Sequence, residues 1–150
     1  RALPSGRLRK PSRQMPNWEL LTALASSKMG ERVQVGPLAP EQKGVSLGIA
    51  GWDGSAYAIE LDPDLAERPA ELLETFAHEL AHLVLGHIGK GLPSTPPGAL
   101  EAIVTPELAA KMAAARVAKE ADADQWAERW VAQWEPLQRW ALALACAAPE

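Results

Sequence analysis

Residues 75–87 read TFAHELAHLVLGH, and this stretch decides the interpretation of the chain. It contains an H-E-x-x-H motif formed by His78, Glu79 and His82. On a helix, residues four apart lie one turn apart on the same face, so the two histidines can bind one metal ion together. Glu79 lies next to the first histidine and can take a proton from a water molecule, as in zinc peptidases. The motif therefore predicts a metal-dependent hydrolytic site on a helix.

The flanks of the motif indicate that this helix is buried. Between residues 75 and 86 the only charged residue, with histidine counted as neutral, is Glu79. Two histidines and a glutamate on an apolar helix are costly to bury unless they are paired or bind metal, which favours a metal site over unliganded core histidines. Pro69 is suited to the first turn of the helix, and Gly86 is suited to the position just after its end.

A zinc site needs a third protein ligand in addition to the two histidines. His87 lies nine residues after His78, about 180° round a helix of 3.6 residues per turn, so we expect it to lie at the helix end and not to be a ligand. A second long helix is expected from about Pro106 to Trp134, and it carries an acidic stretch at residues 119–127. The third ligand is therefore sought there.

The helical period separates the acids of this stretch into two groups. Asp122, Trp126 and Trp130 recur at four-residue spacing and share a face. Because a tryptophan stripe is expected to face the core, Asp122 is the acid that we expect to point inward, with a solvated helix surface as the alternative. Glu120 and Asp124 lie about 160–200° away and are expected to point to solvent.

The motif helix, preceded by the strand-like residues 56–61, resembles that of the ImmA/IrrE-type zinc metallopeptidases. It is also similar to the zincin domain at the C-terminus of ArdC-type antirestriction proteins. In that family a later helix carries E-A-(D/N)-x-F-A, whose first acid is the third metal ligand. Residues 122–127, DADQWA, match this pattern in register with Asp for Glu and Trp for Phe. The resemblance covers roughly residues 30–135, and the motif helix is its most specific part.

The resemblance implies a Zn²⁺ ion held by His78, His82 and Asp122, with Glu79 as the general base. Because aspartate is one methylene shorter than glutamate, Glu120 remains an alternative third ligand. The implied activity is that of a zinc endopeptidase acting on a specific protein or peptide substrate, such as a transcriptional regulator. Two alternatives remain: a metal-stabilised interaction module without catalysis, and a helical adaptor domain that binds no metal.

The expected fold class is α+β, a small zincin-like domain with a short antiparallel sheet packed on the motif helix and further helices around it. Residues 1–15 are expected to form a flexible basic tail or linker, and residues 16–150 the metallopeptidase domain. Glycine-rich turns separate short apolar segments. The other expected elements are strands at 32–35, 45–49 and 56–61, and helices at about 18–29 and 137–147. The turn at residues 52–55 predicts a hairpin, and 56–61 is expected to be the sheet edge that holds an extended substrate.

Charge and cysteine content limit the remaining function classes. The chain has 150 residues, a formal net charge of −4 and one cysteine, Cys146, so no intramolecular disulfide framework exists and a reducing cytoplasm is expected. Basic residues gather before residue 14, and any contact with nucleic acid is expected only through this tail. No apolar segment reaches the length of a membrane span, so no membrane partner is expected.

Overall fold

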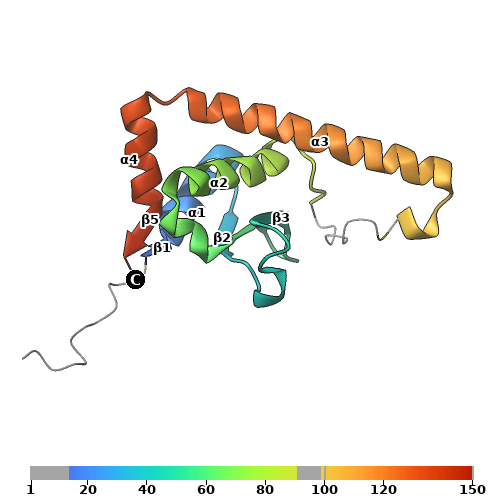
Figure 1. Ribbon diagram of the computed structural model, residues 1–150, viewed down its shortest axis with the longest axis horizontal. Coiled ribbons are helices and arrows are strands. Elements are labelled where there is room, and N and C mark those ends of the chain that lie inside the picture. The colour runs from blue at the N-terminus through green and yellow to red at the C-terminus, as the bar shows by residue number, and fades with distance from the viewer. Residues whose placement is uncertain (1–13, 91–98, 100, 150) are drawn as a thin grey trace, which may run out of the picture.

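The computed structural model describes residues 14–90, 99 and 101–149, and the chain has a mixed α+β fold (Figure 1). The expected tail falls mainly outside these residues, except that Gln14 and Met15 belong to a strand. The main elements in chain order are β1 (Gln14–Pro16), α1 (Trp18–Met29), β2 (Val33–Pro37), β3 (Gly48–Trp52), β4 (Tyr57–Leu61), α2 (Pro69–Val84), α3 (Pro106–Ala132), α4 (Pro136–Cys146) and β5 (Ala147–Pro149). Short 3-10 helices occur at η2 (Pro40–Gln42), η3 (Pro63–Glu67) and η4 (Glu101–Ile103).

The larger sheet has the strand order β2-β4-β3. Strands β3 and β4 form the expected antiparallel hairpin, whose turn is held by the Asp53 carboxylate accepting hydrogen bonds from the N–H groups of Ser55 and Ala56, each at 2.8 Å. Strand β2 pairs with β4 in parallel, so the expectation of a wholly antiparallel sheet was wrong. The expectation that residues 56–61 form the sheet edge was also wrong, because β4 is the central strand and β3 is an edge.

Helix α2 packs on this sheet and forms the centre of the hydrophobic core. Its side chains Leu72, Phe76 and Leu80 are fully buried, as are Ile59 and Leu61 of β4. The helix starts with Pro69 in its first turn and stops before Gly86, which adopts a left-handed φ of 74°. Both boundaries agree with the expected helix, and each follows from the backbone preference of the terminal residue.

Helix α3 crosses α2, and its two halves have different surroundings (Figure 1). In the C-terminal half, Ala123, Ala127 and Trp130 are buried. The N-terminal half is largely exposed and extends beyond the body of the molecule. Trp126 stacks on Trp130 with a centroid distance of 5.7 Å, so aromatic packing fixes one end of the helix while the other lies in solvent.

A second, two-stranded sheet pairs β1 with β5. The backbone N–H of Asn17 also donates to the carbonyl oxygen of Cys146, so the beginning of α1 is tied to the end of α4. The sequence had not suggested this pairing. Among the described helices, none has an apolar stretch of the length and hydropathy that crossing a bilayer requires.

Candidate metal centre

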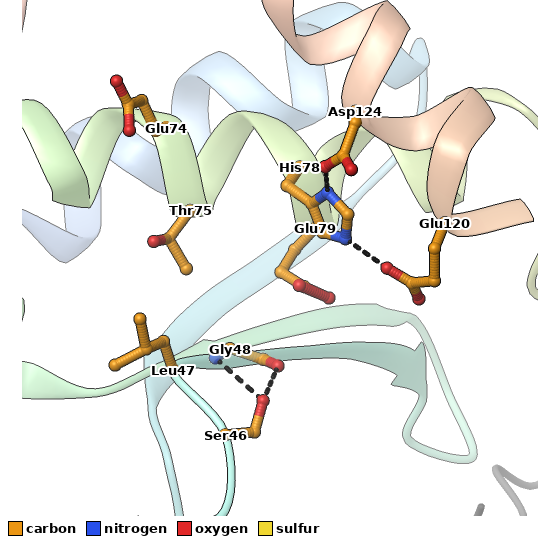
Figure 2. A pocket seen from close by; sticks show the side chains of 9 residues that line it. All are labelled: Ser46, Leu47, Gly48, Glu74, Thr75, His78, Glu79, Glu120 and Asp124. Carbon is orange, nitrogen blue, oxygen red and sulfur yellow. Dashed lines mark hydrogen bonds and ion pairs between the residues drawn. The ribbon is translucent and has the colours of Figure 1, made fainter. Parts of the chain in front are cut away.

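Two helices bring three potential metal ligands together. His78 and His82 lie one turn apart on α2, with 3.2 Å between their Nε2 atoms. Glu120 of α3 reaches both rings: one carboxylate oxygen lies 2.8 Å from Nε2 of His78 and the other lies 3.1 Å from Nε2 of His82. The group therefore joins residues about 40 positions apart in the chain, and Figure 2 shows Glu120 directed at the His78 ring.

The donor set and its spacing fit a metal ion. The three ligand atoms, two imidazole nitrogens and one carboxylate oxygen, all lie within 4.8 Å of one another. Two ligands about 2.05 Å from a tetrahedral zinc ion are about 3.3 Å apart, close to the separation of the two Nε2 atoms. Both nitrogens also face the Glu120 carboxylate, so a proton or a metal ion must lie between each lone pair and the carboxylate oxygens. The residues present are therefore able to hold a metal ion.

The second ring nitrogen of each histidine, Nδ1, has a hydrogen-bond partner of its own, which leaves Nε2 available for a metal. Nδ1 of His78 lies 2.8 Å from a carboxylate oxygen of Asp124, which accepts a hydrogen bond from a proton on Nδ1. Nδ1 of His82 lies 2.9 Å from Nδ1 of His87. A neutral imidazole carries one proton, so a proton placed on Nδ1 leaves the Nε2 lone pair free for a metal. Carboxylates and other acceptors commonly orient metal-binding histidines in this way.

The position of His87 follows from the end of α2. Gly86 takes the left-handed conformation, and the N–H of His87 then donates to the carbonyl oxygen of His82 at 2.9 Å. This glycine-dependent turn folds the chain back over the last helical turn. His87 therefore contacts His82 without joining the three-residue ligand group, as expected for a residue at the helix end.

Glu79 is buried beside the ligand group. The pKa of its carboxyl group is raised from 4.5 to about 7, mainly by burial; the charge of His78 opposes this rise and the charge of Glu120 adds to it. Burial also lowers the pKa of His82, which favours the neutral imidazole that a metal requires. The site thus combines a neutral ligand with a carboxyl group that exchanges a proton near neutral pH.

The group opens into a cleft of about 430 Å³ between α2, α3 and the start of β3. Figure 2 shows Ser46 and Gly48 along one side of the cleft, with Glu79 on α2 above them. A Cβ atom at Gly48 would lie 3.0 Å from Cγ of Glu79 and 3.1 Å from Cγ2 of Thr75. The backbone of β3 therefore passes so close to Glu79 that only glycine fits without movement.

The structure groups Glu120, and not the expected Asp122, with the two histidines. Asp122 is exposed and is not part of the ligand group. Burial lowers the pKa of His87, and the charge of Asp122 opposes this shift. Glu120, expected to point to solvent, contacts both histidines instead. The buried face of α3 consists of Ala123, Ala127 and Trp130, with Trp130 against Phe76 of α2, whereas Trp126 is only partly buried.

A signal for Glu120 was present in the sequence. Residues 120, 123, 127 and 130 follow a spacing of three and four, which is the spacing of one contact face in packed helices. Glu120 extends by one turn the buried stripe formed by Ala123, Ala127 and Trp130. The expectation that Glu120 and Asp124 share a face is confirmed, but that face points to the motif helix.

Comparison of the chain with protein-family models, with curated protein sequences and with solved structures gave no significant match.

Proposed function

We propose that this protein is a zinc-dependent endopeptidase that hydrolyses a peptide bond in a protein or peptide substrate. The observation that carries the proposal is the buried Glu79 carboxyl group, which lies in the same cleft as His78 and Glu120. Three ligands leave a fourth position for substrate or water in catalytic zinc sites. The resemblance of the motif helix to the ImmA/IrrE-type peptidases supports the same assignment.

In the proposed hydrolysis, metal binding and proton transfer are carried out by different residues. His78, His82 and Glu120 would hold the ion, which supplies a lowered pKa for water and polarisation of the substrate carbonyl. Glu79 accepts the proton of the attacking water and returns it to the leaving amine. A pKa near 7 suits both transfers, because a general base works best when its pKa is close to the working pH.

Strand β3 provides a surface for an extended substrate. It is an edge strand of the β2-β4-β3 sheet, and its first residue, Gly48, lines the cleft. An extended peptide can add to such an edge through main-chain hydrogen bonds. Because Gly48 lets the backbone of β3 pass close to Glu79, a peptide paired with this strand would lie near the proposed general base.

A second candidate is a metal-stabilised interaction module without catalysis. The observation that favours it is that the ligand group joins α2 to the exposed part of α3, where packing is provided by alanines. A metal bound there would stabilise the helix pair whether or not a substrate is cleaved.

The experiment that separates these candidates is the substitution Glu79→Gln. Glutamine keeps the size of the side chain but accepts no proton at neutral pH, so we expect the variant to retain zinc and to lose cleavage of a quenched-peptide library. Glu71→Gln is the matched control, because Glu71 lies on α2 in a surface ion pair with Arg68. Cleavage by Glu79→Gln at the rate of the parent contradicts the peptidase proposal. Zinc binding without cleavage in the parent favours the interaction module.

A further inference from the structure

A second groove lies next to the cleft, enclosed by the first half of α2, the end of α3 and α4. It has a volume of about 470 Å³. Its apolar walls are formed by Ala70 and Leu73 of α2, Val131 of α3, and Trp140 and Leu144 of α4. Trp140 is 63% exposed and Leu144 is 43% exposed, so two large apolar side chains face solvent at one place. Exposed apolar patches of this kind commonly mark binding sites.

The groove adjoins the proposed active site. Glu74 lines both hollows, and Figure 2 shows it on α2 at the end of the cleft opposite Glu120. Ala70, Glu74 and His78 follow each other at four-residue spacing and so form one line along α2. A ligand that enters the cleft can therefore continue along α2 into the groove.

The distance between the two hollows sets the length of the ligand. Eight residues separate Ala70 from His78, which corresponds to about 12 Å along a helix that rises 1.5 Å per residue. An extended peptide covers about 3.3–3.6 Å per residue. A side chain in the groove therefore belongs to a residue about three positions from the bond at the ligand group.

Charge adds a second requirement on the ligand. Glu74 is exposed, and within residues 14–90, 99 and 101–149 the structure gives it no ion-pair partner. It lies between the ligand group and the apolar walls, where it can pair with a basic side chain. Arg139 on the α4 side can donate to main-chain carbonyl oxygens of the same peptide.

We propose that this groove is a specificity site for a substrate segment with a large apolar side chain about three residues from the scissile bond and a basic side chain between them. The proposal rests on the proposed peptidase function and names the class of its substrate. The apolar side chain packs against Trp140 and Leu144, and the basic side chain pairs with Glu74.

The test maps the bonds that the zinc-loaded protein cleaves in a library of peptides from a proteome digest. We expect Phe, Trp, Leu or Met two to four residues from the cut on one side, and Lys or Arg closer to it. The variant Trp140→Ala/Leu144→Ala should lower kcat/KM for the best peptide at least about tenfold and remove the apolar preference. Glu74→Lys should replace the basic preference with an acidic one. Leu137→Ala is the control, because Leu137 is 73% exposed on α4 and does not line the groove.

Each outcome has a separate meaning. Cleavage with an unchanged profile in the Trp140→Ala/Leu144→Ala variant overturns the groove assignment and leaves the peptidase function intact. Absence of cleavage by the zinc-loaded parent overturns the peptidase function and the substrate assignment with it. The alternative occupant of the groove is a second copy of the chain, and sedimentation of the parent and all the variants tests it. If the parent is a dimer and the Trp140→Ala/Leu144→Ala variant is a monomer, a second copy fills the groove and the proposal is overturned.

Discussion

Replacement of Glu120 by alanine should remove most of the affinity for the proposed zinc ion. In the structure Glu120 is the carboxylate that contacts both histidines, at 2.8 Å and 3.1 Å, whereas Asp122 lies outside the ligand group. Four-ligand structural zinc sites bind with about 10–16 kcal/mol, or about 2.5–4 kcal/mol for each ligand. Loss of one ligand therefore corresponds to a Kd raised about 100-fold to 1,000-fold.

The assay is competition for zinc against a chromophoric chelator at pH 7.5, with Asp122→Ala as the matched control. The side chain of Glu120 is 59% exposed and alanine favours helix, so the variant should fold as the parent does without metal. The increase in thermal midpoint on zinc addition should become much smaller for Glu120→Ala and stay unchanged for Asp122→Ala. The reasoning is refuted if Asp122→Ala loses zinc while Glu120→Ala keeps it.

Three further predictions concern residues around the ligand group and the core. Asp124→Ala should weaken zinc binding about 10-fold to 100-fold, because it removes the carboxylate that orients His78. The fold should remain intact because Asp124 is exposed. Chelator competition measures zinc binding, and circular dichroism measures folding. Gly48→Ala should reduce kcat while zinc is retained, and should destabilise the fold by about 1–3 kcal/mol, because its Cβ would lie 3.0 Å from Cγ of Glu79. Single-turnover kinetics measures the first effect and urea unfolding the second. Burial raises the pKa of the Cys146 thiol from 9.0 to about 11, so the neutral thiol stabilises the fold below pH 9 and this contribution is lost as pH rises through 11. Relative to Cys146→Ala, the free energy of unfolding should fall by up to about 3 kcal/mol between pH 9 and pH 11, and an identical pH profile for the two proteins would contradict the prediction.

The parts of the fold that local residue preferences control were predictable from the sequence. Proline in the first turn and glycine after the end placed the boundaries of α2, and Gly30 similarly marks the end of α1 at Met29. The Asp53 turn identified the β3–β4 hairpin, because its hydrogen bonds are formed within four residues. The parallel pairing of β2 with β4 joins residues 24 positions apart, such as Val33 and Tyr57, and no local pattern contains it.

In the candidate site, too, the local arrangement was predictable and the long-range contact was not. His78, Glu79 and His82 are fixed relative to each other by one helix, so their arrangement follows from sequence spacing. The third ligand depends on how two helices cross. The tryptophan stripe was a misleading guide to that crossing, because Trp126 packs under Lys28 of α1 and only Trp130 contacts Phe76 of α2.

The pairing of β1 with β5 determines how the molecule responds to a mechanical load. Gln14 lies opposite Pro149, and the strands are antiparallel, so a pull applied at these two residues opens the hydrogen bonds one after another. Peeling of this kind needs less force than shearing, in which all the bonds carry the load together. The next contact in line is the bond from Asn17 to Cys146, which leads to α1 and α4. Tension between flanking segments would therefore separate the two terminal strands first, while the helix that carries the two histidines stays in place.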